Sequence, residues 1–293
     1  MKTKVSNGTL YIVATPIGNA EDLSSRARHI LSQADIVAAE DTRTTQKLFS
    51  ILDIKNKTVS NHKFNEKSKA DYLLSELEKG KNIALVSDAG TPCISDPGGV
   101  IVKAALEKDI QVVGIPGASA IITALSICGF CFNSFTFYGF LPRNGGEIKN
   151  TIKNAGNRED DVSIFFESPR RIKKSLEIFA EQVPDADLCL CNDLTKLYER
   201  IYRGKPCAIL EELLVNPSAE KGEYTLVASL KARPKMDLKE TMSPEAMLID
   251  YMAKSKGSIK DAVKTLAEKY KADFTKKDFY NASLNLRSML SGR

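Results

Sequence analysis

Four short stretches of small and polar residues are the parts of this sequence best suited to hold a ligand. Each follows an apolar run typical of a buried strand, and in an open parallel sheet ligands bind beyond the carboxyl ends of strands. Glycines such as Gly90 and Gly117 let backbone amides approach a ligand closely, although they could equally serve only to turn the chain. The stretches are ATPIGN (14–19), SDAGTPCISDPGG (87–99), GIPGASA (114–120) and FESPRR (166–171).

The side chains in these loops favour a cationic ligand over a nucleotide phosphate. The first loop does not have the GxGxxG pattern of dinucleotide-binding proteins, and the phosphate-binding pattern GxxxxGK[ST] is absent from the chain. Asp88 would repel a phosphate but suits an ammonium or sulfonium group. Asp96 either contacts the same ligand or caps a helix beginning at Pro97. No compact group of histidine, cysteine and aspartate predicts a metal, so we expect a ligand with an amine, a carboxylate and a flat ring.

A regular alternation of strands and helices positions the first three loops. Apolar runs predict buried strands, and segments with helical periodicity lie between them. Strands that are apolar throughout indicate a parallel sheet covered on both faces. The sequence therefore predicts an N-terminal α/β domain over residues 1–132, with strands at 9–14, 34–39, 82–87 and 110–115.

A second α/β domain is expected over residues 133–232, followed by a small helical region at 240–293. A helix should follow the loop at 166–171, with Ser168 as its N-cap and Pro169 as its first residue. The last strand should pair back into a mixed sheet, and three short helices are predicted within 244–290. The strands of this domain are predicted at 134–141, 162–167, 187–193 and 223–230.

The charge of the chain is concentrated near its C-terminus. The 293 residues carry a net charge of +5, and residues 231–293 alone carry 14 Lys/Arg against 8 Asp/Glu. This asymmetry favours a polyanion partner such as RNA, although lysine-rich helices can also be merely solvated. The six cysteines are interpreted as small buried residues rather than as redox or metal sites. The N-terminus does not resemble a secretory signal and the longest apolar run is too short for a membrane span, so we expect a cytoplasmic protein.

Six motifs resemble, in their order and spacing, those of the tetrapyrrole methylase superfamily and, within it, the bacterial RsmI branch. They are LYIVATPIGN, ADIVAAEDTR, LVSDAGTPCISDPG, GIPGASAIITAL, FFESPRRI and KGEYTLV. The resemblance implies two α/β domains with S-adenosylmethionine (SAM) in the cleft between them, usually in a homodimer. It implies methylation of the ribose 2′-hydroxyl of a cytidine in the decoding centre of 16S rRNA, in the assembled small subunit. The alternatives are a methyltransferase acting on a precorrin-type tetrapyrrole and a SAM-binding RNA chaperone without catalysis.

The resemblance also assigns roles to individual residues. The cofactor should contact Pro16, Asp88, Ala89, Gly90, Thr91, Ser119, Ala120, Phe166 and Leu194. Lys196 and Glu199 match a family stretch near the cleft, or form a surface ion pair. The basic charge of the helical region and of the loops suggests contacts with RNA from Arg43, Arg143, Arg170, Arg171, Lys260, Lys264, Lys276 and Lys277.

A base that removes the proton of a ribose hydroxyl should come from one of two polar loops. Glu40 and Asp41 follow the second strand in AAEDTR, and we expect the base among them, with His62 of SNHKFNEKS as the next candidate. Asp41 could equally cap the helix that follows it. The family often has a second histidine where this chain has Phe64, which weakens the case for a catalytic role of that loop.

Overall fold

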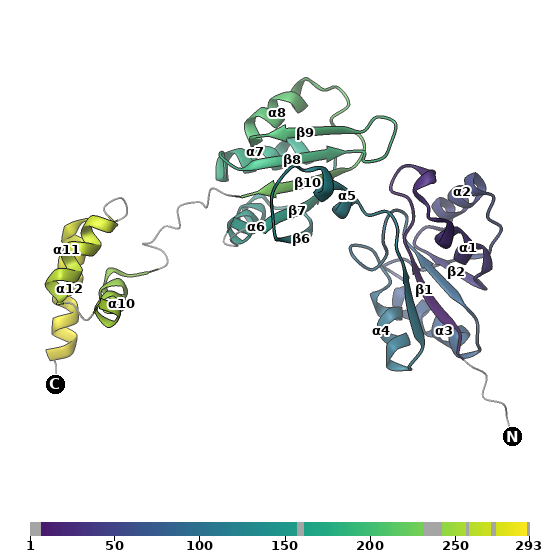
Figure 1. The fold of residues 1–293 in the computed structure, drawn as a ribbon, viewed down its shortest axis with the longest axis horizontal. Helices are drawn as coiled ribbons and strands as arrows, with labels where there is room; N and C mark the ends of the chain where they lie inside the picture. The colour runs from purple at the N-terminus through teal and green to yellow at the C-terminus, as the bar shows by residue number, and fades with distance from the viewer. Residues whose placement is uncertain (1–6, 157–160, 231–241, 256–257, 271–273, 292–293) are drawn as a thin grey trace. The chain divides into compact units, whose positions relative to one another are not determined.

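The computed structural model describes residues 7–156, 161–230, 242–255, 258–270 and 274–291. These residues belong to two compact units, residues 1–231 and 232–293. The first unit holds two five-stranded sheets, and the second consists of three helices. Figure 1 shows the elements of each unit and labels most of them.

The first sheet is parallel throughout, as predicted. Its strand order is β3-β2-β4-β1-β5, so the order reverses between β1 and β4. Every residue of β2 and β4 is buried, because helices cover both faces of the sheet. The strands are β1 (Thr9–Val13), β2 (Ile36–Ala39), β3 (Thr58–Ser60), β4 (Ile83–Val86) and β5 (Gln111–Ile115).

Two pairs of helices form the outer layers of this sheet. Helices α1 (Ser25–Gln33) and α2 (Thr42–Leu52) pack on one face through Leu31 and Phe49. Helices α3 (Glu66–Glu78) and α4 (Gly99–Glu107) pack on the other face. Ser24 caps α1, since its side chain accepts a hydrogen bond from the Ala27 N–H. A 3₁₀ turn, η1 (Ala20–Asp22), precedes α1.

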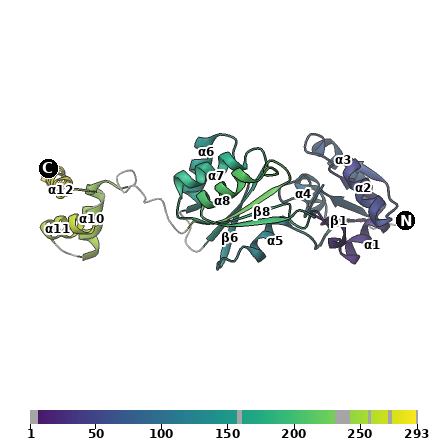
Figure 2. The same cartoon turned by 90° about the horizontal axis from the view of Figure 1, so that it is seen from above.

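The second sheet is mixed, with strand order β6-β7-β10-β8-β9. Strand β10 lies at its centre and runs antiparallel to both β7 and β8. Figure 2 shows α6, α7 and α8 together on one side of this sheet and α5 on the other. The strands are β6 (Ser134–Phe140), β7 (Asp161–Glu167), β8 (Asp187–Asn192), β9 (Arg200–Gly204) and β10 (Tyr224–Ser229); the helices are α5 (Ala120–Ile127), α6 (Gly145–Gly156), α7 (Ile172–Gln182) and α8 (Pro206–Val215).

The predicted start of the helix after FESPRR is wrong. Residues Ser168–Arg171 form a turn in which the backbone N–H groups of Arg171 and Ile172 both donate to the Ser168 carbonyl. The Arg171 side chain is anchored at the same time to the Leu141 and Pro142 carbonyls and to Glu167. This anchoring fixes the turn, so α7 begins only at Ile172.

The second unit has a hydrophobic core of its own. Its helices are α10 (Pro244–Ser255), α11 (Ile259–Lys269) and α12 (Lys276–Ser291), and they pack through Leu248, Leu266 and Phe279. Ser258 and Asp261 form a capping box that begins α11. The boundary predicted between the domain at 133–232 and the helical region at 240–293 lies outside the described residues.

Candidate functional site

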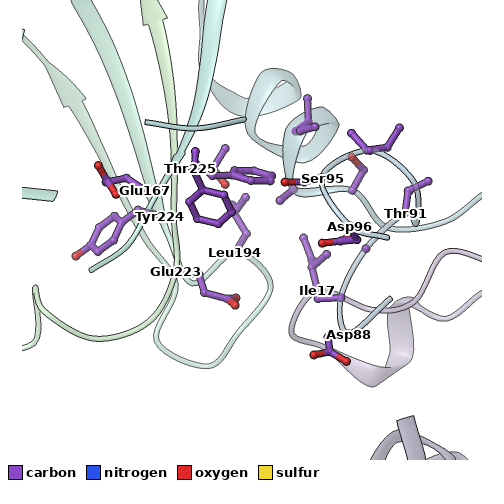
Figure 3. Close-up of a pocket in the computed structure, with 18 of the residues that line it drawn as sticks. Ile17, Asp88, Thr91, Ser95, Asp96, Glu167, Leu194, Glu223, Tyr224 and Thr225 are labelled. Carbon is purple, nitrogen blue, oxygen red and sulfur yellow. The ribbon is translucent and has the colours of Figure 1, made fainter. Parts of the chain in front are cut away.

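A cavity of about 430 Å³ lies in the first unit, between loops that leave the ends of both sheets. Figure 3 shows that residues such as Ile17, Asp88 and Thr91 reach it from one side, and Leu194 and Tyr224 from the other. Eight of the nine predicted cofactor-binding residues line this cavity: Asp88, Ala89, Gly90, Thr91, Ser119, Ala120, Phe166 and Leu194. For the ninth position, the neighbouring Ile17 lines the cavity instead of Pro16.

Two loops on the first sheet's side are joined by backbone hydrogen bonds. The Thr15 N–H donates to the Gly90 carbonyl at 2.9 Å, and the Gly90 N–H donates to the Thr15 carbonyl at 3.0 Å. Gly90 has φ +78, and a Cβ built there would lie 3.3 Å from the Ile17 side chain. A glycine is therefore needed where these loops pair, and the pairing fixes one wall of the cavity.

The first turn of α5 forms a second part of the wall. Ser119 caps this helix, and Ser119, Ala120 and Ile121 line the cavity. The unpaired N–H groups of a helix N-terminus favour a negatively charged group nearby. This wall is therefore suited to a carboxylate.

Three carboxyl groups make another part of the cavity wall acidic. The Asp88 carboxylate accepts a hydrogen bond from the Asp41 N–H at 3.0 Å, and Glu40 and Asp96 also line the cavity. Burial raises the pKa of the Glu40 carboxyl, and the charges of Asp96 and Asp88 raise it further. Burial likewise raises the pKa of both Asp88 and Asp96. A raised pKa makes a carboxylate a stronger base, which suits a group that must accept a proton.

Asp41 and His62, the other two base candidates, have different surroundings. The Asp41 carboxylate caps α2 through the Arg43 N–H at 2.8 Å and pairs with the Arg43 guanidinium at 2.7 Å. These contacts with Arg43 lower the pKa of Asp41 to about 2, which makes it a weak base. Neither Asp41 nor His62 lines the cavity, and the His62 ring packs edge-on against Phe64.

The second sheet supplies the apolar wall of the cavity and a contact between the two sheets' loops. Phe140, Phe166 and Leu194 line this wall. The backbone N–H of Asn19 donates to the Thr195 hydroxyl at 3.1 Å, so the loop after β1 meets the loop after β8. This wall presents flat and branched apolar side chains, which suit a ring system.

Lys196 and Glu199 hold the loop after β8 in place. The Lys196 ammonium bonds Asp193 at 2.7 Å and Glu223 at 2.9 Å, while the Glu199 carboxylate accepts the Thr195 N–H at 2.6 Å. Both side chains are thus committed to the protein itself. Lys196 therefore forms ion pairs with Asp193 and Glu223 rather than with Glu199, whose carboxylate bonds a backbone N–H.

Sequence reasoning assigns no role to the stretch Gly222–Thr225, yet these four residues line the cavity. Gly222 has φ +81, and a Cβ there would lie 2.0 Å from the Asp193 carboxylate. The motif KGEYTLV contains these four residues, but they reach the cavity only because β10 lies between β7 and β8, which the sequence does not show.

The predicted RNA-binding residues are distributed over both units. Arg43, Arg143 and Arg170 are exposed on the first unit, and Lys260, Lys264, Lys276 and Lys277 are exposed on α11 and α12. The Arg171 side chain is only 31% exposed and bonds Glu167 at 2.9 Å. Its contacts give it a structural role beside the predicted one.

Two kinds of site are not found within the described ranges. No group of three or more histidine, cysteine, aspartate or glutamate side chains in them could hold a metal ion. No helix of the described residues combines the length and apolar character that a bilayer span requires.

Comparison with known proteins identifies the family. Residues 9–209 match the family model of the Tetrapyrrole (Corrin/Porphyrin) Methylases. The chain is 39% identical over 292 residues to a ribosomal RNA small subunit methyltransferase I of Halalkalibacterium halodurans, covering 96% of this chain and 98% of the relative. It is 40% identical over 264 residues to the Haemophilus influenzae protein of the same name, covering 90% and 92%.

Solved structures show the same fold at low sequence identity. A diphthine synthase matches with a TM-score of 0.60 and 16% identity, over 76% of this chain and 90% of that one. A cobalt precorrin-4 methyltransferase matches with a TM-score of 0.54 and 17% identity, over 75% and 94%. The family model and the sequence relatives show that the chain belongs to the tetrapyrrole methylase family and, within it, to the ribosomal RNA small subunit methyltransferase I family.

Proposed function

We propose that this protein transfers a methyl group from SAM to the ribose 2′-hydroxyl of a cytidine in the decoding centre of 16S rRNA. The observation that carries the proposal is the division of the cavity into three chemically different walls. The names of the relatives support the rRNA substrate. The cytidine, its 2′-oxygen and the decoding centre are implied by the sequence motifs.

The three walls fit the parts of SAM. The cavity volume of about 430 Å³ is within the usual range for small-molecule sites, about 300–1,000 Å³. The first turn of α5 would hold the carboxylate, Asp88 would face the ammonium group, and Phe140, Phe166 and Leu194 would contact the adenosine. When bound there, SAM supplies a methyl group on a positively charged sulfur, which leaves as a neutral thioether and needs no acid.

The protein must then position the ribose oxygen and remove its proton. Holding the oxygen in line with the methyl carbon and the sulfur contributes several kcal/mol to catalysis. Glu40 is the base we propose, because it lines the cavity and because burial and its acidic neighbours raise its pKa, which makes its carboxylate a stronger base. A base of this kind adds about 10²–10⁴ in rate.

The basic residues would hold the RNA. The exposed lysines of α11 and α12 can contact phosphates without reading sequence, and Arg43, Arg143 and Arg170 can do so on the first unit. We propose the assembled small subunit as the substrate and a cytoplasmic homodimer as the active form. Sedimentation of the purified protein tests the dimer, and a monomer with full activity contradicts it.

A labelling experiment tests the main proposal. The protein is incubated with methyl-labelled SAM and, in separate reactions, with small ribosomal subunits lacking the modification, naked 16S rRNA and a precorrin. Label in a cytidine ribose of the subunit supports the proposal. Label in the precorrin alone contradicts it, as does tight SAM binding without transfer to any acceptor. Glu40→Gln should retain SAM binding and lose at least about 100-fold in rate.

A further inference from the structure

Asn61 lies beside Glu40 at the end of the first sheet. The pairing of β2 with β3 extends one residue past β3, because the Asn61 N–H donates to the Ala39 carbonyl at 2.7 Å. In a parallel ladder this bond places Asn61 opposite Glu40, with the two backbones about 4.8 Å apart. Two residues earlier, Ala38 and Val59 both pack beneath α3 and α4. Both residues come directly after the ends of β2 and β3, and the alternation of side chains, continued by one residue, puts Asn61 and Glu40 on that same side.

The Asn61 side chain is buried without a partner. It is 1% exposed, and neither its Nδ2 nor its Oδ1 atom has a hydrogen bond within the described residues. A buried polar group in this state destabilises a protein, so it calls for an explanation. Asn56 shows the usual situation, because its amide donates to the Leu31 and Ala34 carbonyls, each at 2.7 Å.

An amide is a suitable neighbour for a group that gains and loses a proton. Its N–H donates to a carboxylate, and its oxygen accepts from a protonated carboxyl, so it can bond both forms of Glu40. Direct contact with a nucleobase is disfavoured, because the side chain is almost fully buried. Hydrogen bonds in an active site also tighten once substrate is bound, so their absence in the free protein does not argue against them.

We infer that Asn61 is a positioning residue for Glu40, and that its amide bonds the Glu40 carboxylate in the complex with substrate. The inference rests on the proposed function, in which Glu40 is the base. The bond holds the carboxylate at one orientation and stabilises its ionised form. Without this donor, Glu40 must ionise among other carboxyl groups, with no hydrogen bond from Asn61 to stabilise its negative charge.

The groups around Glu40 predict the direction of the effect. Carboxylates dominate its surroundings, and Arg43 is paired with Asp41. Glu66 on α3 is bonded to the Gly98 and Val100 N–H groups, so it adds negative charge on the same side. His62 follows Asn61 in the chain. The neighbouring carboxylates are those of Asp41, Asp88, Asp96 and Glu66. Loss of a hydrogen-bond donor in these surroundings raises the pKa of Glu40, so methyl transfer should require a higher pH.

The test compares the pH dependence of methyl transfer in N61L, N61D and the wild type. Leucine and aspartate both have nearly the shape of asparagine; leucine has no donor, and aspartate has none when it is ionised. For N61L the acid limb of the pH profile of kcat should move to higher pH by about one unit. At pH values below the limb kcat should then fall about tenfold, and at pH values above it kcat should change little. N61D adds a charge and should move the limb further. SAM affinity should not change.

Thermal stability provides an independent readout. N61L removes an unpartnered buried amide, so its Tm should equal or exceed that of the wild type. The matched control is N56L, which removes three formed hydrogen bonds, two donated by the Asn56 Nδ2 atom and one accepted from the Lys57 N–H. Its Tm should fall and its acid limb should stay in place. An N61L protein whose acid limb is unmoved overturns the inference, and so does one that loses rate equally at every pH. E40Q separates the two levels: an active E40Q protein refutes Glu40 as the base, whereas an inactive one with an unmoved N61L limb refutes only the role of Asn61.

Discussion

Replacing Gly222 by alanine tests whether the loop after β8 is held against the cavity by close contact. Gly222 has φ +81, and a Cβ at this position would lie 2.0 Å from the Asp193 Oδ2 atom and 2.4 Å from its Cγ. The left-handed backbone costs an alanine about 1–2 kcal/mol. Asp193 must also move away from the Lys196 ammonium, 2.7 Å distant, which costs about 1 kcal/mol at this partly exposed pair. The free energy of unfolding should therefore fall by about 2–3 kcal/mol.

Two assays measure this effect. For a unit of this size, the loss corresponds to a decrease in Tm of about 4–12 °C. Moving Asp193 also moves Leu194, which lines the cavity, so SAM affinity should fall about five- to tenfold. Calorimetric titration of SAM measures this second change.

Gly129 offers a matched control. It also has φ +81, but nothing lies within 4 Å of a Cβ built there. The free energy of unfolding of G129A should therefore fall only by the cost of the left-handed backbone, about 1–2 kcal/mol, and the variant should bind SAM normally. Equal losses of Tm in the two variants, with unchanged SAM affinity in G222A, would refute the contact between Gly222 and Asp193 as a support of the cavity.

Three further changes test other parts of the structure. Asp88→Asn should weaken SAM and S-adenosylhomocysteine alike by roughly tenfold or more in calorimetry, because both carry the ammonium group; a loss for SAM alone would assign Asp88 to the sulfonium. Glu76→Gln should lower stability at pH 7, because Lys79 and Lys81 lower the pKa of Glu76 below 4.5. That stabilisation is present above about pH 4.5 and disappears as the pH falls through the lowered pKa of the folded state, so the Tm values of variant and wild type should converge at acidic pH. A difference in Tm that stays constant down to acidic pH would exclude this pair of contacts. Deleting residues 235–293 should weaken RNA binding and reduce its salt dependence while SAM affinity stays unchanged, and an unaltered salt slope would contradict the role of the C-terminal lysines.

The strands that could be predicted are those whose every residue is buried. Strands β2 and β4 are apolar throughout because helices cover both faces of their sheet. Strand β9 could not be predicted in this way, because it lies at the edge of its sheet, pairs with β8 and carries two arginines instead of a continuous apolar run. Helix α6 begins with two glycines, which are typical of loops, and only its packing through Ile148 and Ile152 makes it helical.

The loops of the site could be predicted, but the state of their side chains could not. Parallel strands bring their carboxyl ends to one edge, which is why Asp88 and Ser119 meet at one cavity. The difference between Glu40 and Asp41 depends on the Arg43 side chain, which pairs with only one of the two carboxylates. Asn61 has the sequence surroundings of an ordinary loop residue, and its burial results from tertiary packing that the sequence pattern does not show.

The paired backbone bonds between Thr15 and Gly90 have a consequence for how quickly a cofactor is captured. They join two loops from separate strands into one stiff rim before any ligand arrives. A ligand that enters such a rim does not have to order these two loops, so little conformational entropy is lost on association. Diffusion into the cavity, rather than rearrangement of these two loops, then sets the rate of capture at this wall.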